Sequence, residues 1–433
     1  MLKPYFWTWD HSTNWKKNEH GKQVCGANNW YTKRPEAFLE DYKRLISWSA
    51  DHGIETIGIA GLLRDCHGGV EAAREITEYA AQKGVQTYEV CGLAAYNGVY
   101  YDGESPWCLD NFLKDNPDCL AIDTEGKPLV KMCGQDSNKL IRHACLSKQK
   151  TRDYICRSLE WLFKEVPALS GISIETGDTG TCQCPECRKR RSMEETILSA
   201  EDMAYMYPLA IDSIRSVKPD ALVICETYSH FLPLPNPAGD GRVFGWGLQE
   251  PQIQALSALP KDVYISWVAD MCLGQWKETD AMPEPLKDHK HLMRAHYGTQ
   301  WFYSIRHQLE LDKIQRMCRL SAGAGMEGVS LFGESSVFNA NNELNYLAEL
   351  YFAKQPFHTV ENFLKDVAAD LLGGEEAAHS WCMINKKIDE QTVSAKDVDL
   401  TVEYAAGLQG EQRRRWVWLG SYAASHCWDR MQL

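Results

Sequence analysis

Residues 171–178 read GISIETGD, a short apolar run that leads into the carboxylate of Glu175. The pattern recurs as LVICE at 222–226, YISWVAD at 264–270 and GVSLFGE at 328–334. Each run has the length and the β-branched or aromatic content of a buried strand. Parallel barrels gather functional groups at the carboxyl ends of several strands, so these endings predict a shared site.

Strand-like and helix-like segments alternate along the chain, which favours a parallel sheet with crossover helices. The apolar residues of 35–52 recur at helical spacing, and Gly84 is placed to end a helix over 70–82. Further helices are predicted over 148–164 and 200–217. The expected strands are 5–9, 55–59, 85–90, 171–174, 222–225, 263–267, 300–304 and 328–332. This order predicts an α/β protein with a (β/α)8 TIM-barrel fold.

Two parts extend the basic barrel. The segment 94–145 is too long for an ordinary connection after the third strand, so we expect a functional insertion there. The barrel domain is predicted to cover residues 1–336. Residues 337–433 carry helical patterns without a strand signal, and they predict a C-terminal helical region packed on the barrel.

Composition excludes several classes of function. The 433 residues carry a formal net charge of −13, which disfavours a nucleic-acid or anionic-membrane partner. No run approaches the ~18 apolar residues of a membrane span, and because Met1 leads almost directly into the first predicted strand we expect no signal peptide. The 16 cysteines are scattered through predicted strands and helices, which suits reduced thiols and a cytoplasmic protein. A homo-oligomer is compatible with the sequence.

The carboxylates at the strand ends are the predicted catalytic groups. Glu175 is the expected general acid, because burial or a neighbouring carboxylate can tune a glutamate at a barrel mouth. Asp178 could be that neighbour, or it could orient the substrate. Glycoside hydrolysis usually needs two carboxyl groups, and the predicted partner is Glu334, with Glu226 and Asp270 as alternatives. For each acid, a structural role at the barrel rim is the competing interpretation.

Aromatic and polar side chains beside the strand ends are candidates for sugar binding. Tryptophan rings there could stack on a pyranose or pack in the core; they are Trp7, Trp9, Trp246, Trp267 and Trp301. Hydrogen bonds to hydroxyls, or to a substrate carboxylate through arginine, are predicted for further side chains, with a structural role as the equal alternative. These are Asp10, His11, His67, Arg142, His143, Tyr228, Asp270 and Arg306.

Three cysteines follow Glu175 with the spacing Cys-x-Cys-x-x-Cys, at Cys182, Cys184 and Cys187. Such spacing lets thiolates share one zinc ion, and Cys145 is the candidate fourth ligand. The site would be structural rather than catalytic. The alternative is a set of free thiols packed in a loop. No organic cofactor is indicated, because phosphate-loop, dinucleotide-binding and His-Glu-x-x-His motifs are absent from the sequence.

The order ETGDTG at 175–180 followed by CQCPEC at 182–187 resembles a group of bacterial (β/α)8 glycoside hydrolases. These are the β-N-acetylhexosaminidase-like and α-glucuronidase-like barrels, including relatives with a Cys-x-Cys-x-x-Cys loop after strand four. RHACLS at 142–147 and the segment 111–117 are also similar to that group. The resemblance implies that Glu175 is the proton donor. The adjacent Asp-Glu pair of the hexosaminidases is here Ile174-Glu175, which argues against substrate-assisted cleavage.

Together these features predict a glycoside hydrolase that trims an oligosaccharide or glycoconjugate from one end, with the insertion closing one side of the mouth. Two other classes remain open. One is a carbohydrate-binding barrel without catalysis, and the other is a metal-dependent hydrolase or isomerase.

Overall fold

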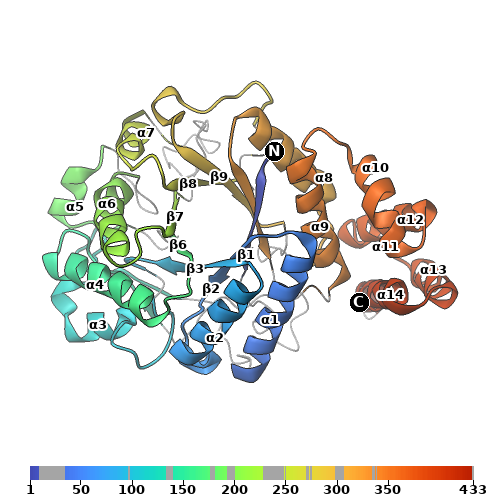
Figure 1. Ribbon diagram of the computed structural model, residues 1–433, viewed down its shortest axis with the longest axis horizontal. Coiled ribbons are helices and arrows are strands. Elements are labelled where there is room, and N and C mark those ends of the chain that lie inside the picture. Colours follow the sequence, from blue (N-terminus) through green and yellow to red (C-terminus); the bar gives the residue numbers. More distant parts are fainter. Residues whose placement is uncertain are drawn as a thin grey trace.

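The computed structural model describes residues 1–8, 35–95, 98–132, 140–175, 181–192, 200–227, 248, 250–269, 273, 276–297, 307–333, 337 and 339–431. Eight parallel strands form a closed barrel in the order β1-β10-β9-β8-β7-β6-β3-β2 (Figure 1). They are β1 (Lys3–Thr8), β2 (Thr56–Ala60), β3 (Gln86–Gly92), β6 (Gly171–Glu175), β7 (Leu222–Glu226), β8 (Tyr264–Val268), β9 (Lys290–Ala295) and β10 (Gly328–Gly333). The predicted (β/α)8 barrel is confirmed.

Helices surround the barrel (Figure 1). They are α1 (Pro35–His52), α2 (Gly69–Gln82), α4 (Gln149–Glu165), α6 (Ala200–Val217), α7 (Glu250–Ser257), α8 (Leu311–Gly323) and α9 (Ala340–Lys354). In α1 the buried face includes Phe38, Leu45 and Ile46, as the helical spacing predicts. Gly84 follows α2 with φ of +74°, a conformation that ends the helix at the expected place. None of the described helices has both the length and the apolar character needed to cross a membrane.

Alternation along the strands separates the barrel interior from the layer between strands and helices. The interior cluster includes Tyr5, Trp7, Tyr88 and Phe332. The other face of the strands belongs to the main core, whose strand residues include Phe6, Ile57, Ile174, Cys225, Ile265, Trp267 and Met293. Each strand is therefore buried on both faces.

The seventh barrel strand is β9, and the prediction of residues 300–304 for it was wrong. Leu292 pairs with Gly328 of β10, and Arg294 pairs with Val268 of β8, so β9 fills the gap between its neighbours. The segment 290–295 reads KHLMRA, whose three basic residues hide its strand character. The barrel accommodates this polarity because Arg294 finds an acidic partner inside it. Residues 298–306, which include the predicted strand, lie outside the described residues.

The insertion after β3 has structure of its own. It contains α3 (Leu109–Asp115), the short helix η4 (Pro117–Cys119) and two short strands, β4 (Val130–Met132) and β5 (Leu140–Arg142). The two strands pair antiparallel and are separate from the barrel. This small unit leads directly into the segment that carries Cys145.

Beyond the barrel, the described chain is helical to its end. The elements are α10 (Val360–Phe363), the π-helical turn η6 (Leu364–Ala368), α11 (Ala369–Leu372), α12 (Glu375–Asp389), α13 (Ala395–Gly407) and α14 (Gly410–Met431). Helices α10–α14 lie together at one side of the barrel (Figure 1). Arg415 of α14 forms a buried ion pair with Glu343 of α9 at 2.6 Å, and this pair fastens the helical region to the barrel's last helix.

Gly58 of β2 is required by the packing of the barrel interior. A Cβ atom there would lie 2.2–2.5 Å from the ring and hydroxyl of Tyr88, whose hydroxyl donates to the Phe6 carbonyl at 3.1 Å. We expect Gly58→Ala to lower the free energy of unfolding by roughly 1–3 kcal/mol, as overpacked cores do. Denaturant unfolding measures the change. Gly407→Ala, where no atom lies within 4 Å of the new Cβ, is the control and should cost nothing. Equal stability of both variants would contradict the packing argument.

Candidate functional site

Glu175 and Glu226 are the last residues of neighbouring barrel strands, β6 and β7. Ile174 of β6 pairs with Cys225 of β7, so the residues that follow them, Glu175 and Glu226, lie opposite each other at the strand ends. Glu175 comes two residues after Ser173, and Glu226 two residues after Ile224, so both glutamates share the interior face with these residues. Strands in a sheet lie about 4.8 Å apart, so the two side chains start from adjacent points at the carboxyl end of the barrel. Two of the predicted carboxylates are therefore brought together.

Glu226 belongs to a buried polar group inside the barrel. Its Oε1 lies 3.1 Å from Nε of Arg294, and both side chains are only 1% exposed. Ser173 donates a hydrogen bond to the same carboxylate at 3.5 Å. Nη1 of Arg294 lies 3.2 Å from Nε2 of His296, and its guanidinium stands 5.3 Å from the centre of the Trp7 ring. Burial of an ion pair costs desolvation energy, and these additional contacts offset part of that cost inside the barrel.

Aromatic rings inside the barrel pack next to Arg294 and His296. The Trp7 and Phe332 rings lie 4.3 Å apart, and the His296 ring meets Phe332 edge-on at 4.7 Å. The glutamates thus share the carboxyl end of the barrel with buried aromatic rings. Arg294 and His296 were missed from the sequence because β9 was missed. The alternation of Leu292, Arg294 and His296 against His291, Met293 and Ala295 was the available signal.

Helix α6 holds the ends of the two glutamate strands. The hydroxyl of Tyr207, which is buried, lies 3.1 Å from the Ile174 carbonyl and 2.5 Å from the Glu226 carbonyl. One proton is thus shared between two main-chain acceptors on neighbouring strands. This contact fixes the backbone next to both carboxylates from outside the barrel.

Four side chains predicted to bind substrate are described, and each lies in a segment that makes contacts within the protein. His67 stacks on Phe38 of α1 with ring centres 3.8 Å apart, and Trp267 faces outward and donates to Nδ1 of His291 at 3.1 Å. Arg142 lies 3.5 Å from Asp110 within the insertion. His143 is buried, and its carbonyl accepts a hydrogen bond from the Ala121 amide at 2.8 Å.

The side chains of His67 and Trp267 are both buried, and their contact with a substrate stays a prediction. The remaining predictions lie outside the described residues. They are Trp9, Asp10, His11, Asp178, Tyr228, Trp246, Asp270, Trp301, Arg306 and Glu334.

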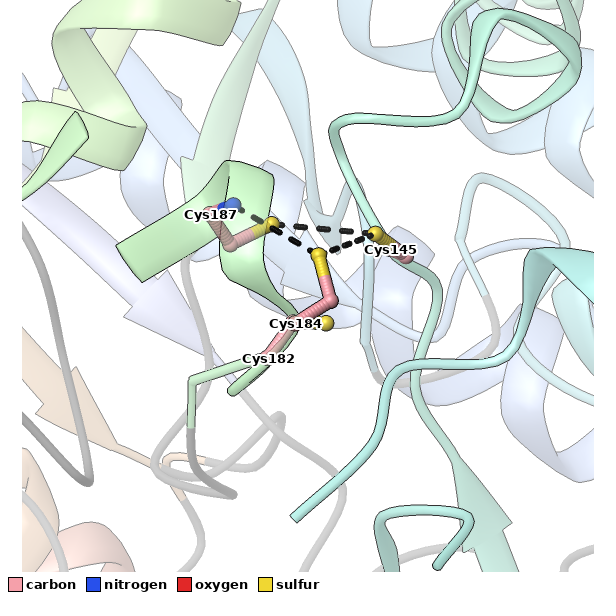
Figure 2. A group of neighbouring side chains, drawn as sticks. All are labelled: Cys145, Cys182, Cys184 and Cys187. Carbon is pink, nitrogen blue, oxygen red and sulfur yellow. Dashed lines mark hydrogen bonds between the residues drawn. The ribbon is translucent and has the colours of Figure 1, made fainter. Parts of the chain in front are cut away.

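The four predicted thiols meet at one point, as Figure 2 shows. All four sulfur atoms lie within 4.8 Å of one another, and Cys145 Sγ is 3.6 Å from Sγ of both Cys184 and Cys187. A tetrahedral site with Zn–S bonds of about 2.3 Å would place its sulfurs roughly 3.8 Å apart. The donor set and its spacing fit a metal ion with four thiolate ligands.

The cysteine cluster joins two connections of the barrel. Cys145 follows the insertion after β3, whereas Cys182 and Cys184 precede α5 (Pro185–Arg190), which contains Cys187. Main-chain hydrogen bonds support the junction: the Cys145 amide donates to the Cys119 carbonyl at 2.8 Å, and the Gln183 amide donates to the Ile122 carbonyl at 2.7 Å. Because β3 and β6 are neighbours in the barrel, the cluster ties together loops that leave adjacent strands.

Comparisons with known proteins place the fold among solved barrels. No family model and no curated protein matches the sequence. The structure is similar to an O-GlcNAc hydrolase from Thermobaculum terrenum, with a TM-score of 0.51 and 11% identity over 90% of this chain and 79% of that one. A β-N-acetylhexosaminidase from Bacteroides fragilis gives 0.44 and 13%, covering 81% and 65%. An endo-1,4-β-mannanase from Rhizomucor miehei gives 0.45 and 12%, covering 72% and 91%. At these identities, the first similarity supports a shared barrel fold.

The buried ion pair makes a testable contribution to stability. Arg294→Met would leave Glu226 buried without its cation, so we expect the free energy of unfolding to fall by about 3–5 kcal/mol. The double variant Glu226→Gln/Arg294→Met should cost less than the sum of the single changes. Lys127→Met, which breaks an exposed pair with Glu125, is the control and should cost less than about 1 kcal/mol. Denaturant unfolding compares the variants, and a strictly additive double variant would contradict the coupling.

Proposed function

We propose that this protein is a glycoside hydrolase that removes a sugar from the end of an oligosaccharide or glycoconjugate. The observation that carries the proposal is the position of Glu175 and Glu226 at the carboxyl ends of neighbouring strands. A buried aromatic pair, Trp7 and Phe332, lies inside the barrel near the same end. The similar fold of the O-GlcNAc hydrolase adds support at the level of architecture.

In this proposal Glu175 donates the proton to the leaving oxygen, and a second carboxylate acts as nucleophile or base. Glu334 remains the first candidate for that role, because it directly follows β10. Glu226 is the alternative with described surroundings. Arg294 and Ser173 already donate to its carboxylate, which suits an anionic role better than proton donation. Asp178 would orient the substrate beside Glu175.

The exo mode rests on the insertion after β3. Its helix α3 and its strand pair β4–β5 follow β3 in the chain, and β3 is the neighbour of β6 in the barrel. A unit in that place can close one side of the mouth, so a chain end would enter where a continuous polymer would not.

We also propose that the four cysteines bind one structural zinc ion. Four thiolates complete a tetrahedral coordination sphere and leave no position for a substrate, which disfavours a metal-dependent hydrolase or isomerase. The cysteines must be reduced to bind, in keeping with the cytoplasmic location expected from the sequence.

The catalytic proposal is tested with Glu175→Gln on a panel of aryl glycosides. The amide keeps the shape of the side chain but cannot supply a proton, so turnover should fall by a factor of about 10² or more. Glu186→Gln, an exposed change in the following helix, is the control and should keep parental activity. If Glu175→Gln retains near-full activity on every substrate that the parent cleaves, Glu175 is not the acid.

Ligand binding separates an enzyme from a carbohydrate-binding barrel. If the parent binds sugars but cleaves none of the panel, while Glu175→Ala binds them equally well, the barrel without catalysis is the better description.

The metal proposal predicts about one zinc per chain in protein purified without added metal. Cys184→Ala should lower that zinc content sharply, because three remaining thiolates bind zinc with lower affinity than four. Cys156→Ser, in α4 and outside the cluster, should retain the parental content. Elemental analysis measures all three proteins, and a parent with far less than one zinc per chain would overturn the proposal.

A further inference from the structure

We propose that Arg190, held in place by Asp202, is the cation that stabilises the metal-bound cysteine cluster, and that Ser147 completes its contact with Cys187. The inference rests on the proposed zinc site and deepens it. It identifies the residues beyond the ligands that set how tightly this site holds a divalent cation.

The first observation is that two groups converge on one sulfur. Nη2 of Arg190 lies 3.4 Å from Sγ of Cys187, and Oγ of Ser147 lies 3.0 Å from the same sulfur. Nη1 of Arg190 also lies 3.3 Å from Oγ of Ser147. The guanidinium can therefore donate both to the sulfur and to the hydroxyl, and the hydroxyl can donate to the sulfur. Cys187 accepts from both partners in this arrangement.

The second observation is the charge of the site. Four thiolates around a divalent cation carry a net charge of −2, and the cysteines are at most 8% exposed. Burial of such a charge is costly unless a cation stands nearby. Arg190 is the described guanidinium in contact with a cluster sulfur. The site thus has a charge that must be balanced and a cation placed to balance it.

The third observation is that the cation is anchored. Nε of Arg190 lies 2.7 Å from Oδ1 of Asp202, and Nη2 of Arg191 lies 2.6 Å from Oδ2 of the same carboxylate. One carboxylate shared by two guanidiniums leaves a net charge of +1 beside the cluster. The Arg190 guanidinium also stands 4.2 Å from the centre of the Tyr205 ring. Asp202 and Tyr205 both belong to α6, so the orientation of Arg190 is set by a helix rather than by a loop.

Contacts beyond the ligands commonly change metal affinity by 10–100-fold, because they fix ligand orientation and charge. We expect Arg190→Gln to weaken zinc binding by about that factor while four-thiolate coordination persists. Arg190→Lys should recover part of the lost affinity, because lysine restores the positive charge but not the planar set of guanidinium donors. Ser147→Ala should give a smaller loss, because it removes a contact without removing a charge.

The experiment is competition for zinc between the full-length protein and a chelator of known affinity, at fixed pH and salt. Cobalt-loaded samples report coordination through their thiolate-to-metal absorption, and circular dichroism reports the fold. Arg188→Gln is the matched control, because it makes the same chemical change in the same helix at an exposed side chain that contacts Gln183. It should bind zinc within about twofold of the parent, in contrast to the 10–100-fold loss expected at Arg190.

The outcomes separate the two proposals. A parent that binds neither zinc nor cobalt overturns the metal site itself. A parent that binds zinc, with Arg190→Gln indistinguishable from Arg188→Gln, overturns the role of Arg190. If Arg190→Gln fails to fold, Ser147→Ala decides: weaker zinc binding with an intact fold supports the inference, and parental binding overturns it.

Discussion

Closure of eight parallel strands is the constraint on which the rest of this structure depends. Closure buries the inner face of every strand and the surrounding helices bury the outer face, so each polar side chain inside the barrel needs a partner there. Glu226 and Arg294 meet this requirement for each other across the intervening strand β8, and Ser173 adds a further contact. The interior near the carboxyl end is consequently polar and aromatic, whereas the outward faces of the same strands are mainly apolar. That asymmetry is what creates a place for chemistry.

Helix α6 connects the two parts of the candidate site. Near its start, Asp202 holds the two guanidiniums of Arg190 and Arg191 beside the cysteine cluster. Further along, Tyr207 contacts the carbonyls of Ile174 and Glu226 at the ends of the glutamate strands. One rigid element thus positions both a loop junction and two strand ends. Sites supported by helices and strands are held more accurately than sites supported by loops alone.

The sequence predicts the elements whose side chains follow a simple period. The bounds of α1 and α6 match their predictions because apolar residues recur on one helical face. The cysteine cluster was predictable because thiol spacing is itself a local signal. Strand β9 was not predictable in the same way, because Arg294 is stabilised by Glu226, which lies 68 residues away in the chain. The outward orientation of Trp267 was not predictable either, because proximity to a strand end does not reveal which face of the strand a residue occupies.

The cysteine cluster has consequences for the mouth of the barrel beyond its own loops. Its ligands come from connections that leave β3 and β6, and Gly92 at the end of β3 pairs with Glu175 at the end of β6. A metal bound by all four thiols would hold together the two connections that follow these strand ends. The two strand ends cannot separate independently in a closed barrel, so the metal would restrain mainly the loops above them. Hydrogen bonds between strands thus fix the positions of the carboxylates, whereas a metal in the cluster would restrain the insertion after β3.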